Sequence, residues 1–171
     1  YLPSNGYILT SNNIPIKYLL ALLNSKLMEF YFGFIGIMTA GGAFTLKYET
    51  VVEFPIKIVE ENIQNIFITL VDYILAIRDR NSEINYFERL IDSLVYELYF
   101  PNELKAANVK ILKHLIDGNV LQEMPNSWNQ QKRIELIDKV YNILSNHKHP
   151  VSIALFQLDT IEEIRIIEGK Q

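Results

Sequence analysis

The sequence predicts an α+β fold that is predominantly α: a small incomplete sheet with one packed helix, followed by a helical bundle or hairpin extension. Two observations support this. Near the start, apolar residues at helical spacing stand between short runs of strand-forming residues. From residue 62 onward, apolar residues recur every seven positions. The change near residue 60 divides the chain into segment 1–59 and a helical extension, 60–171.

Segment 1–59 is expected to hold a strand at 7–10, one helix and a second strand or extended piece at 44–54. The helix carries its apolar residues on one side, at Ile16, Leu19, Leu20, Leu23, Leu27 and Phe30. Pro15 suits its first turn, Asn12 or Asn13 could cap it, and Gly33 and Gly36 could end it. The chain opens without Met inside what reads as a hairpin, so we expect a fragment of a larger protein whose sheet is completed upstream.

The extension is expected to begin with a pair of helices. Its seven-residue series is Ile63, Leu70, Ile77, Ile84, Ile91 and Leu98. Four residues of this series are followed by a second apolar residue, which lies four positions later for Ile63 and Leu70 and three positions later for Ile84 and Ile91. A break in the polar run 78–83, with Asn81 or Ser82 as a cap, explains the shift and favours a hairpin, while a single long rod stays open.

Further helices are expected beyond Pro101. One covers 103–116 and is closed by Gly118, and another opens at 125–127 with Ser127 as its cap. His149-Pro150 should end that helix. Residues 151–158 are too few to assign, and 161–167 could be a helix or a late strand.

Composition limits the function. The 171 residues include no cysteine, which excludes a disulfide framework and thiolate metal sites. No apolar run is long enough for a membrane span, so a bacterial cytoplasmic location is expected. The net charge is −4, but segment 1–59 has four lysines against three glutamates, or +1, and the rest carries −5. Any DNA contact is therefore expected in the first segment, and weak for this chain alone.

Several motifs carry a resemblance to a known family. They are Leu22-Leu23-Asn24-Ser25-Lys26-Leu27, Gly41-Gly42-Ala43-Phe44, Phe54-Pro55-Ile56 and, further on, Ile91-Asp92-x-Leu94-Val95-Tyr96-x-Leu98-Tyr99. The first three together resemble the TaqI-like C-terminal specificity domain, the target-recognition region of adenine-specific DNA methyltransferases and type IIG restriction-modification enzymes. The fourth resembles a segment found after that domain in the same proteins. The resemblance implies that 1–59 is the C-terminal part of a DNA target-recognition domain. It also implies double-stranded DNA as partner, and a catalytic domain with its S-adenosylmethionine site upstream in the same parent chain.

The candidate DNA-binding residues are Asn24, Ser25, Lys26, Gly41, Gly42, Lys47 and Lys57. Lysine neutralises phosphates, and asparagine and serine can bond to phosphates or base edges. Each has an ordinary alternative: Asn24 and Ser25 could bond within their helix, and the glycine pair could be a plain turn.

No catalytic or metal site is expected in the chain. The glycine pair lacks the strand-loop-helix context of a cofactor loop, and no cofactor is expected in this fragment. Glu103 and Lys105 have a nuclease-like spacing but begin a helix, without the strand and upstream aspartate of such a centre. His147 and His149 point apart on a helix and lack acidic partners. The alternative function is a helical scaffold or subunit-docking module without DNA contact.

Overall fold

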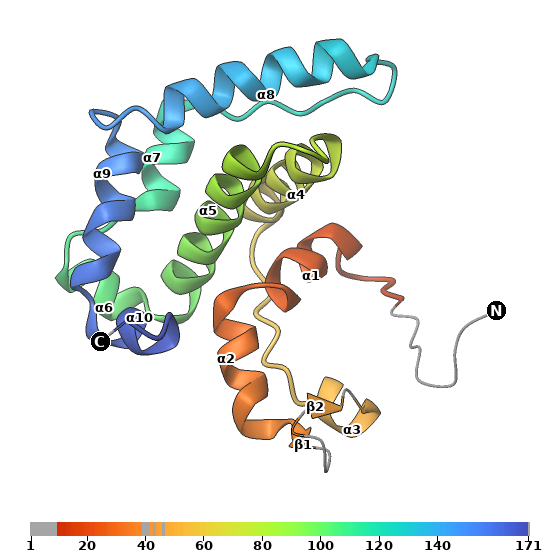
Figure 1. The fold of residues 1–171 in the computed structure, drawn as a ribbon, viewed down its shortest axis with the longest axis vertical. Helices are drawn as coiled ribbons and strands as arrows, with labels where there is room; N and C mark the ends of the chain where they lie inside the picture. Colours follow the sequence, from red (N-terminus) through yellow and green to blue (C-terminus); the bar gives the residue numbers. More distant parts are fainter. Residues whose placement is uncertain (1–9, 39–41, 43, 46, 171) are drawn as a thin grey trace.

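The computed structural model describes residues 10–38, 42, 44–45 and 47–170, and in this part nearly all regular structure is helical (Figure 1). The elements are α1 (Ile16–Leu23), α2 (Lys26–Ile35), β1 (Ile37–Met38), β2 (Phe44–Thr45), α3 (Tyr48–Val51), α4 (Glu61–Ala76), α5 (Asn81–Tyr99), α6 (Pro101–Ala106), α7 (Ile111–Gly118), α8 (Gln130–Leu144), α9 (Pro150–Gln157), a 3₁₀ turn (Leu158–Thr160) and α10 (Glu162–Ile167).

The predicted α+β class with a small sheet is wrong, whereas the helical character is confirmed. The β structure of the described residues is one antiparallel pairing of two-residue pieces, with Ile37 opposite Thr45. Such a pairing has no face broad enough to cover a core. The expected extended piece 44–54 instead contains α3, which begins at Tyr48 with Glu49 in its first turn. The strand predicted at 7–10 falls mostly outside the described residues.

The single helix expected near 16–30 is two helices. Helix α1 ends at Leu23, and α2 starts at Lys26 after a bend through Asn24 and Ser25. The apolar period ran through this bend, so it hid the break. The capping chemistry of Ser25, described below, causes it.

The helical hairpin at the start of the extension is confirmed. Helices α4 and α5 pack against each other and are separated by residues 77–80. Leu70, Ile77 and Ile91 of the seven-residue series are buried, with Phe67 and Phe87 beside them. The repeat therefore marks the stripe on which the two helices meet.

The helix expected at 103–116 is interrupted. Asn108 adopts a positive φ of 56°, and the Val109 N–H donates to the carbonyl of Leu104 at 2.8 Å. This closure ends α6, and α7 starts again at Ile111. Asparagine tolerates the left-handed region better than most residues, and Asn119, with a φ of 45°, ends α7 in the same way.

Helices α8 and α9 also differ from the prediction in their ends. Asn129, not Ser127, caps α8 by accepting from the Lys132 N–H at 2.9 Å. Helix α8 ends at Leu144, and His149-Pro150 begins α9 instead of ending its predecessor. His149 accepts from the Val151 N–H at 3.2 Å as its cap.

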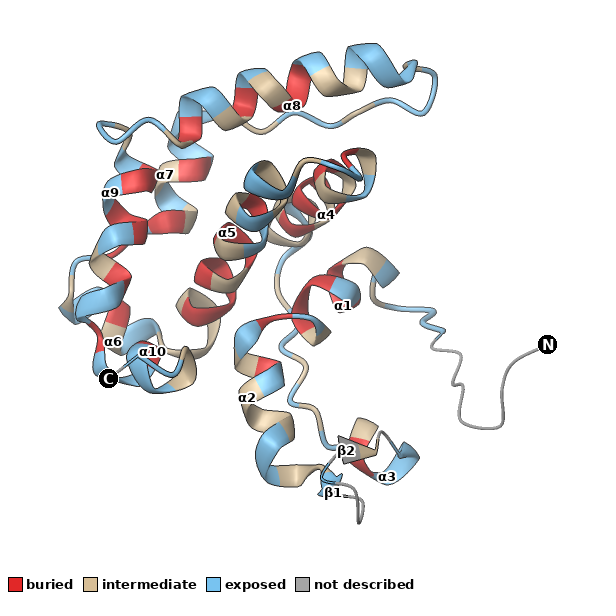
Figure 2. Cartoon of the chain, in the orientation of Figure 1, coloured by how far each residue is buried: buried red, intermediate tan, exposed pale blue. Residues whose placement is uncertain are grey.

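The core is centred on α4 and α5, which lie between α1 and α2 on one side and α7 to α9 on the other (Figures 1 and 2). Tyr18 of α1 packs edge-on against Phe67 of α4, with ring centroids 5.3 Å apart. Residues from both predicted segments therefore share one core. None of the described helices combines the length and apolar composition needed to cross a bilayer.

Candidate nucleic-acid interface

Ser25 is a structural cap at the bend between α1 and α2. Its side chain is only 1% exposed. The hydroxyl donates to the Leu22 carbonyl at 2.7 Å and accepts from the Met28 N–H at 3.4 Å. One serine thus provides a hydrogen-bond partner for a carbonyl in the last turn of α1 and for an N–H in the first turn of α2. The structure places this candidate in the protein interior.

Asn24 and Lys26, on either side of Ser25, are exposed. The Asn24 amide donates to the Leu20 carbonyl at 2.8 Å, so part of its hydrogen-bonding capacity remains for a ligand. The Lys26 ammonium pairs with Glu29 at 2.7 Å, and this partner raises the pKa of the lysine. Exposed pairs of this kind contribute little stability, so Lys26 can exchange its partner for a phosphate at small cost.

Lys57 joins the end of the first segment to α5. Its ammonium donates to the Leu98 carbonyl at 2.6 Å, and its backbone N–H donates to the Tyr99 hydroxyl at 3.0 Å. Its own carbonyl accepts from the Tyr18 hydroxyl at 2.7 Å. These bonds give Lys57 a tethering role within the protein.

Lys47 differs from the other three lysines of the first segment. It is exposed, and in the described part of the chain its ammonium has no hydrogen-bond or ion-pair partner. Lys17, by contrast, pairs with Asp72 of α4. Lys47 is therefore the lysine of segment 1–59 whose charge is most available to a phosphate.

Lys47 lies at one end of the molecule, formed by β1, β2 and α3, which we call the β1–α3 end (Figure 1). The next residue, Tyr48, is 67% exposed, and Phe34 in the last turn of α2 is 74% exposed. Gly42 is also exposed, with a φ of 80° that favours glycine. Gly41 lies outside the described residues.

Aromatic side chains pack the β1–α3 end against α2. Phe54, which follows α3, stacks against Phe32 of α2 with ring centroids 6.1 Å apart. Tyr31 meets the same ring edge-on at 6.2 Å. These contacts hold the segment after α3 against α2. The part of the chain that carries Lys47 and Tyr48 is therefore followed by a segment packed on α2.

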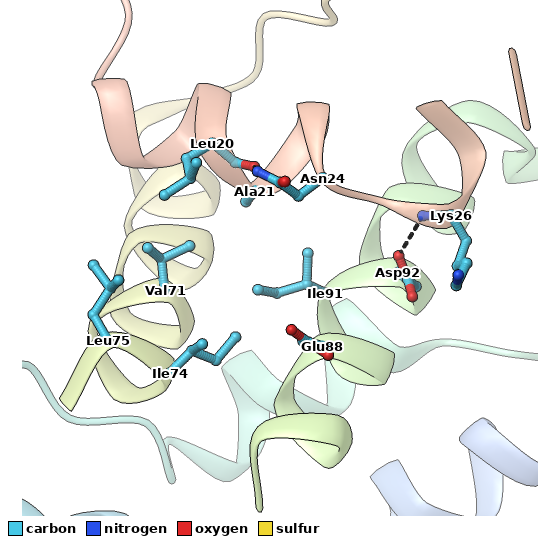
Figure 3. A pocket seen from close by; sticks show the side chains of 10 residues that line it. All are labelled: Leu20, Ala21, Asn24, Lys26, Val71, Ile74, Leu75, Glu88, Ile91 and Asp92. Atoms are coloured by element: carbon cyan, nitrogen blue, oxygen red, sulfur yellow. Dashed lines mark hydrogen bonds between the residues drawn. The ribbon is translucent and has the colours of Figure 1, made fainter. Parts of the chain in front are cut away.

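A separate groove opens beside Asn24, between α1, α4 and α5 (Figure 3). It has a volume of about 320 Å³, apolar walls and two carboxylates, Glu88 and Asp92, at one end. Asp92 accepts from the Lys26 N–H at 2.8 Å. Burial raises the pKa of Asp92 to about 6, the Lys26 N–H opposes this, and the Glu168 and Glu88 carboxylates add to it. This acidic end disfavours phosphate.

The structure therefore does not gather the six described candidates into one surface. Asn24 and Lys26 lie at the bend, Lys47 and Gly42 at the β1–α3 end, and Ser25 and Lys57 make internal bonds. Their DNA contacts stay predictions. Sequence reasoning missed Asp92, although a carboxylate beside Ile91, at the edge of the buried stripe of α5, was a usable signal.

The residues weighed for catalysis lie apart. Glu103 sits in the first turn of the short helix α6, and His149 caps α9 with its Nδ1. Burial, with His114 nearby, lowers the pKa of His149. In the described ranges, no group of three or more His, Cys, Asp or Glu residues is arranged to hold a metal ion.

The comparison with protein families gives one match. Residues 3–56 match the model of the TaqI-like C-terminal specificity domain, which confirms the resemblance. No curated protein and no solved structure matches the chain. The match covers α1 to α3 and the β pairing, and it indicates a DNA-recognition domain of methyltransferase-type systems. Helices α4 to α10 lie outside it.

Proposed function

We propose, on the premise that residues 3–56 form a TaqI-like specificity domain, that the chain is the DNA-recognition part of a bacterial adenine-N6 DNA methyltransferase. The parent would belong to a restriction-modification system, and a parent of the type IIG kind would also carry an endonuclease. This part is itself non-catalytic. A catalytic domain upstream would bind S-adenosylmethionine and methylate the flipped adenine while this part grips the duplex.

The observation that carries the proposal within this chain is the free charge of Lys47 inside the matched segment. Lysine contacts to phosphate supply sequence-independent affinity and set the register of a protein on the duplex. The exposed Tyr48 beside it adds an aromatic ring that can contact a sugar or base. We propose that the β1–α3 end faces the DNA backbone.

The test is fluorescence anisotropy of the chain with a labelled mixed-sequence duplex at several salt concentrations below about 150 mM. We expect binding that weakens linearly on a log–log salt plot. Lys47→Ala should weaken it and reduce the slope by about one, because one phosphate contact is lost. Lys110→Ala, which removes an exposed lysine of the extension, is the matched control and should bind like the wild type.

Two results would count against the proposal. Equal effects of Lys47→Ala and Lys110→Ala would show general electrostatic attraction instead of a site at the β1–α3 end. Absence of binding at the lowest salt would remove the DNA contact from this chain.

A second candidate function is a scaffold that docks onto another domain or subunit. It is favoured for the extension by the charge of −5 over residues 60–171 and by the partly apolar groove beside α4 and α5. The two functions can coexist, because they use different surfaces of the molecule.

A further inference from the structure

The groove between α1, α4 and α5, which we call the three-helix groove, has apolar walls that the described residues leave open (Figure 3). The walls are formed by Leu20, Ala21, Val71, Ile74, Leu75 and Ile91. At the rim, Leu20 is 43% exposed and Leu75 is 56% exposed. One turn before Leu20, Ile16 is 49% exposed and extends the apolar surface along α1.

The groove exists because α1 is short and contacts α4 through only one face. Tyr18 and Leu22 point into the shared core and are fully buried. Ala21, which faces the groove, has a side chain too small to fill the space above Ile91. Helix α1 ends at Leu23, and Asn24 lines the groove where the chain turns toward α2 (Figure 3).

The polar end of the groove carries negative charge. Glu88 and Asp92 lie four residues apart on α5, so they are neighbours on one helix face. In the described structure Glu88 is exposed and has no hydrogen-bond or ion-pair partner. The Lys26 ammonium, whose residue lines the groove, is paired with Glu29. Burial is the main cause of the raised pKa of Asp92, the Glu168 and Glu88 carboxylates add to it, and Lys26 opposes it.

We propose that the three-helix groove docks a segment of a partner protein that presents an apolar side chain beside a lysine or arginine. The apolar side chain would enter between Leu20 and Leu75 and remove both from water. The cation would meet Glu88 and Asp92, which repel DNA and acidic segments. This pairing of an apolar anchor with a complementary charge gives both affinity and selection among partners.

The proposal is independent of DNA recognition. The groove lies outside the β1–α3 end, and its charge is opposite to that of a phosphate-binding surface. Variants of Lys47 should therefore leave the groove unaffected, which keeps the two proposals separable.

The test uses the full 171-residue chain and two fluorescent helical peptides with capped ends and the same leucine stripe. One peptide carries lysines beside the leucines and the other carries glutamates. Anisotropy at about 150 mM salt measures binding, because this ionic strength screens charges that lie farther apart than about 8 Å and leaves close contacts. Methyl chemical shifts of Leu20, Leu75 and Ile91 report where the peptide binds. The lysine peptide should bind and the glutamate peptide should not.

Two groove variants should each weaken the lysine peptide about tenfold or more: Leu75→Asp, which charges the rim, and Glu88→Lys, which reverses the polar end. Their matched controls are Ile153→Asp, an apolar residue of α9 that is 47% exposed, and Glu162→Lys, an exposed acid of α10. The controls and Lys47→Ala should bind like the wild type. All five variants change exposed side chains, and circular dichroism checks their folding.

Three results would overturn the proposal. The first is absence of binding by the lysine peptide, or equal binding of both peptides. The second is an equal loss in groove and control variants. The third is concentration-dependent dimerisation of the chain that Leu75→Asp abolishes, because a second copy would then fill the groove.

Discussion

Asp92 of α5 accepts a hydrogen bond from the backbone N–H of Lys26, the first residue of α2, at 2.8 Å. This bond connects the two predicted segments of the chain. The positive end of α2 and its free N–H groups favour the carboxylate, whereas burial and the nearby Glu88 and Glu168 oppose its charge. The effect of burial is the largest, so the pKa of Asp92 rises to about 6 from an ordinary value of 3.8.

We therefore expect the free energy of unfolding to depend on pH through Asp92. Because its pKa is higher in the folded state, the folded protein holds this proton longer. The stabilisation is fully present below about pH 4 and is lost as pH rises to about 6. Asp92→Asn keeps an oxygen for the Lys26 N–H and removes the charge. It should be more stable than the wild type at pH 7, by on the order of 2–3 kcal/mol.

Urea denaturation of both proteins between pH 4 and pH 7.5 measures this effect. The difference between them should be small at pH 4 and grow toward pH 6. Asp79→Asn, at an exposed aspartate between α4 and α5, is the control and should show no such growth. A pH-independent difference for Asp92→Asn would mean that the carboxylate is not destabilised by burial.

Ser25→Ala should destabilise the protein by about 1 kcal/mol, because it removes the cap of α2 and a bond to the end of α1. Ser127→Ala should be nearly neutral. Ser127 is exposed, and α8 uses Asn129 as its cap. Chemical denaturation followed by circular dichroism compares them, and equal midpoints would refute the capping role of Ser25.

Tyr73→Phe should destabilise the protein by roughly 1–2 kcal/mol. The Tyr73 hydroxyl donates to the Gln122 carbonyl at 2.6 Å and accepts from the Gln122 N–H at 2.9 Å. It thus fastens the segment between α7 and α8 to α4. Tyr48→Phe removes an exposed hydroxyl and should leave the denaturation midpoint unchanged. Hydrogen exchange at the Gln122 N–H should become faster in Tyr73→Phe, and an unchanged rate would show that this bond does not hold the segment.

Tyr48→Ala should weaken DNA binding about three- to tenfold, since a stacked or apolar ring contact is worth about 1 kcal/mol or more. Unlike Lys47→Ala, it should leave the salt slope unchanged, because no charge is removed. Tyr48→Phe retains the ring and should bind like the wild type. If Tyr48→Phe lost as much affinity as Tyr48→Ala, the hydroxyl and not the ring would make the contact.

How far the sequence predicts the fold is clearest at α4 and α5. Their seven-residue repeat and its midway shift depend on local spacing, and the hairpin follows from them. The bend at Ser25 was hidden, because apolar residues on both sides keep one helical period while the break is a capping event. At Asn108 the helix ends through a left-handed residue, a conformation that periodicity does not encode.

The strand or extended piece expected at 44–54 is absent for a different reason. Segment 44–54 is rich in residues that suit a strand, but a strand needs neighbours to complete its hydrogen bonds. In the described residues only two positions of this segment are paired, and helix α3 satisfies much of the following backbone locally.

The sequence by itself determined the family resemblance of the first third, its seven candidate DNA-binding residues and the helical hairpin, because these depend on residue identity and spacing. Only the tertiary structure decided which candidates are free to act. Packing buries Ser25 and ties Lys57 to α5, while Lys47 keeps an unpaired charge in the described part of the chain. The tertiary structure also brings Asp92 to Lys26 and forms the three-helix groove. These relationships link residues far apart in the chain, so no local pattern contains them.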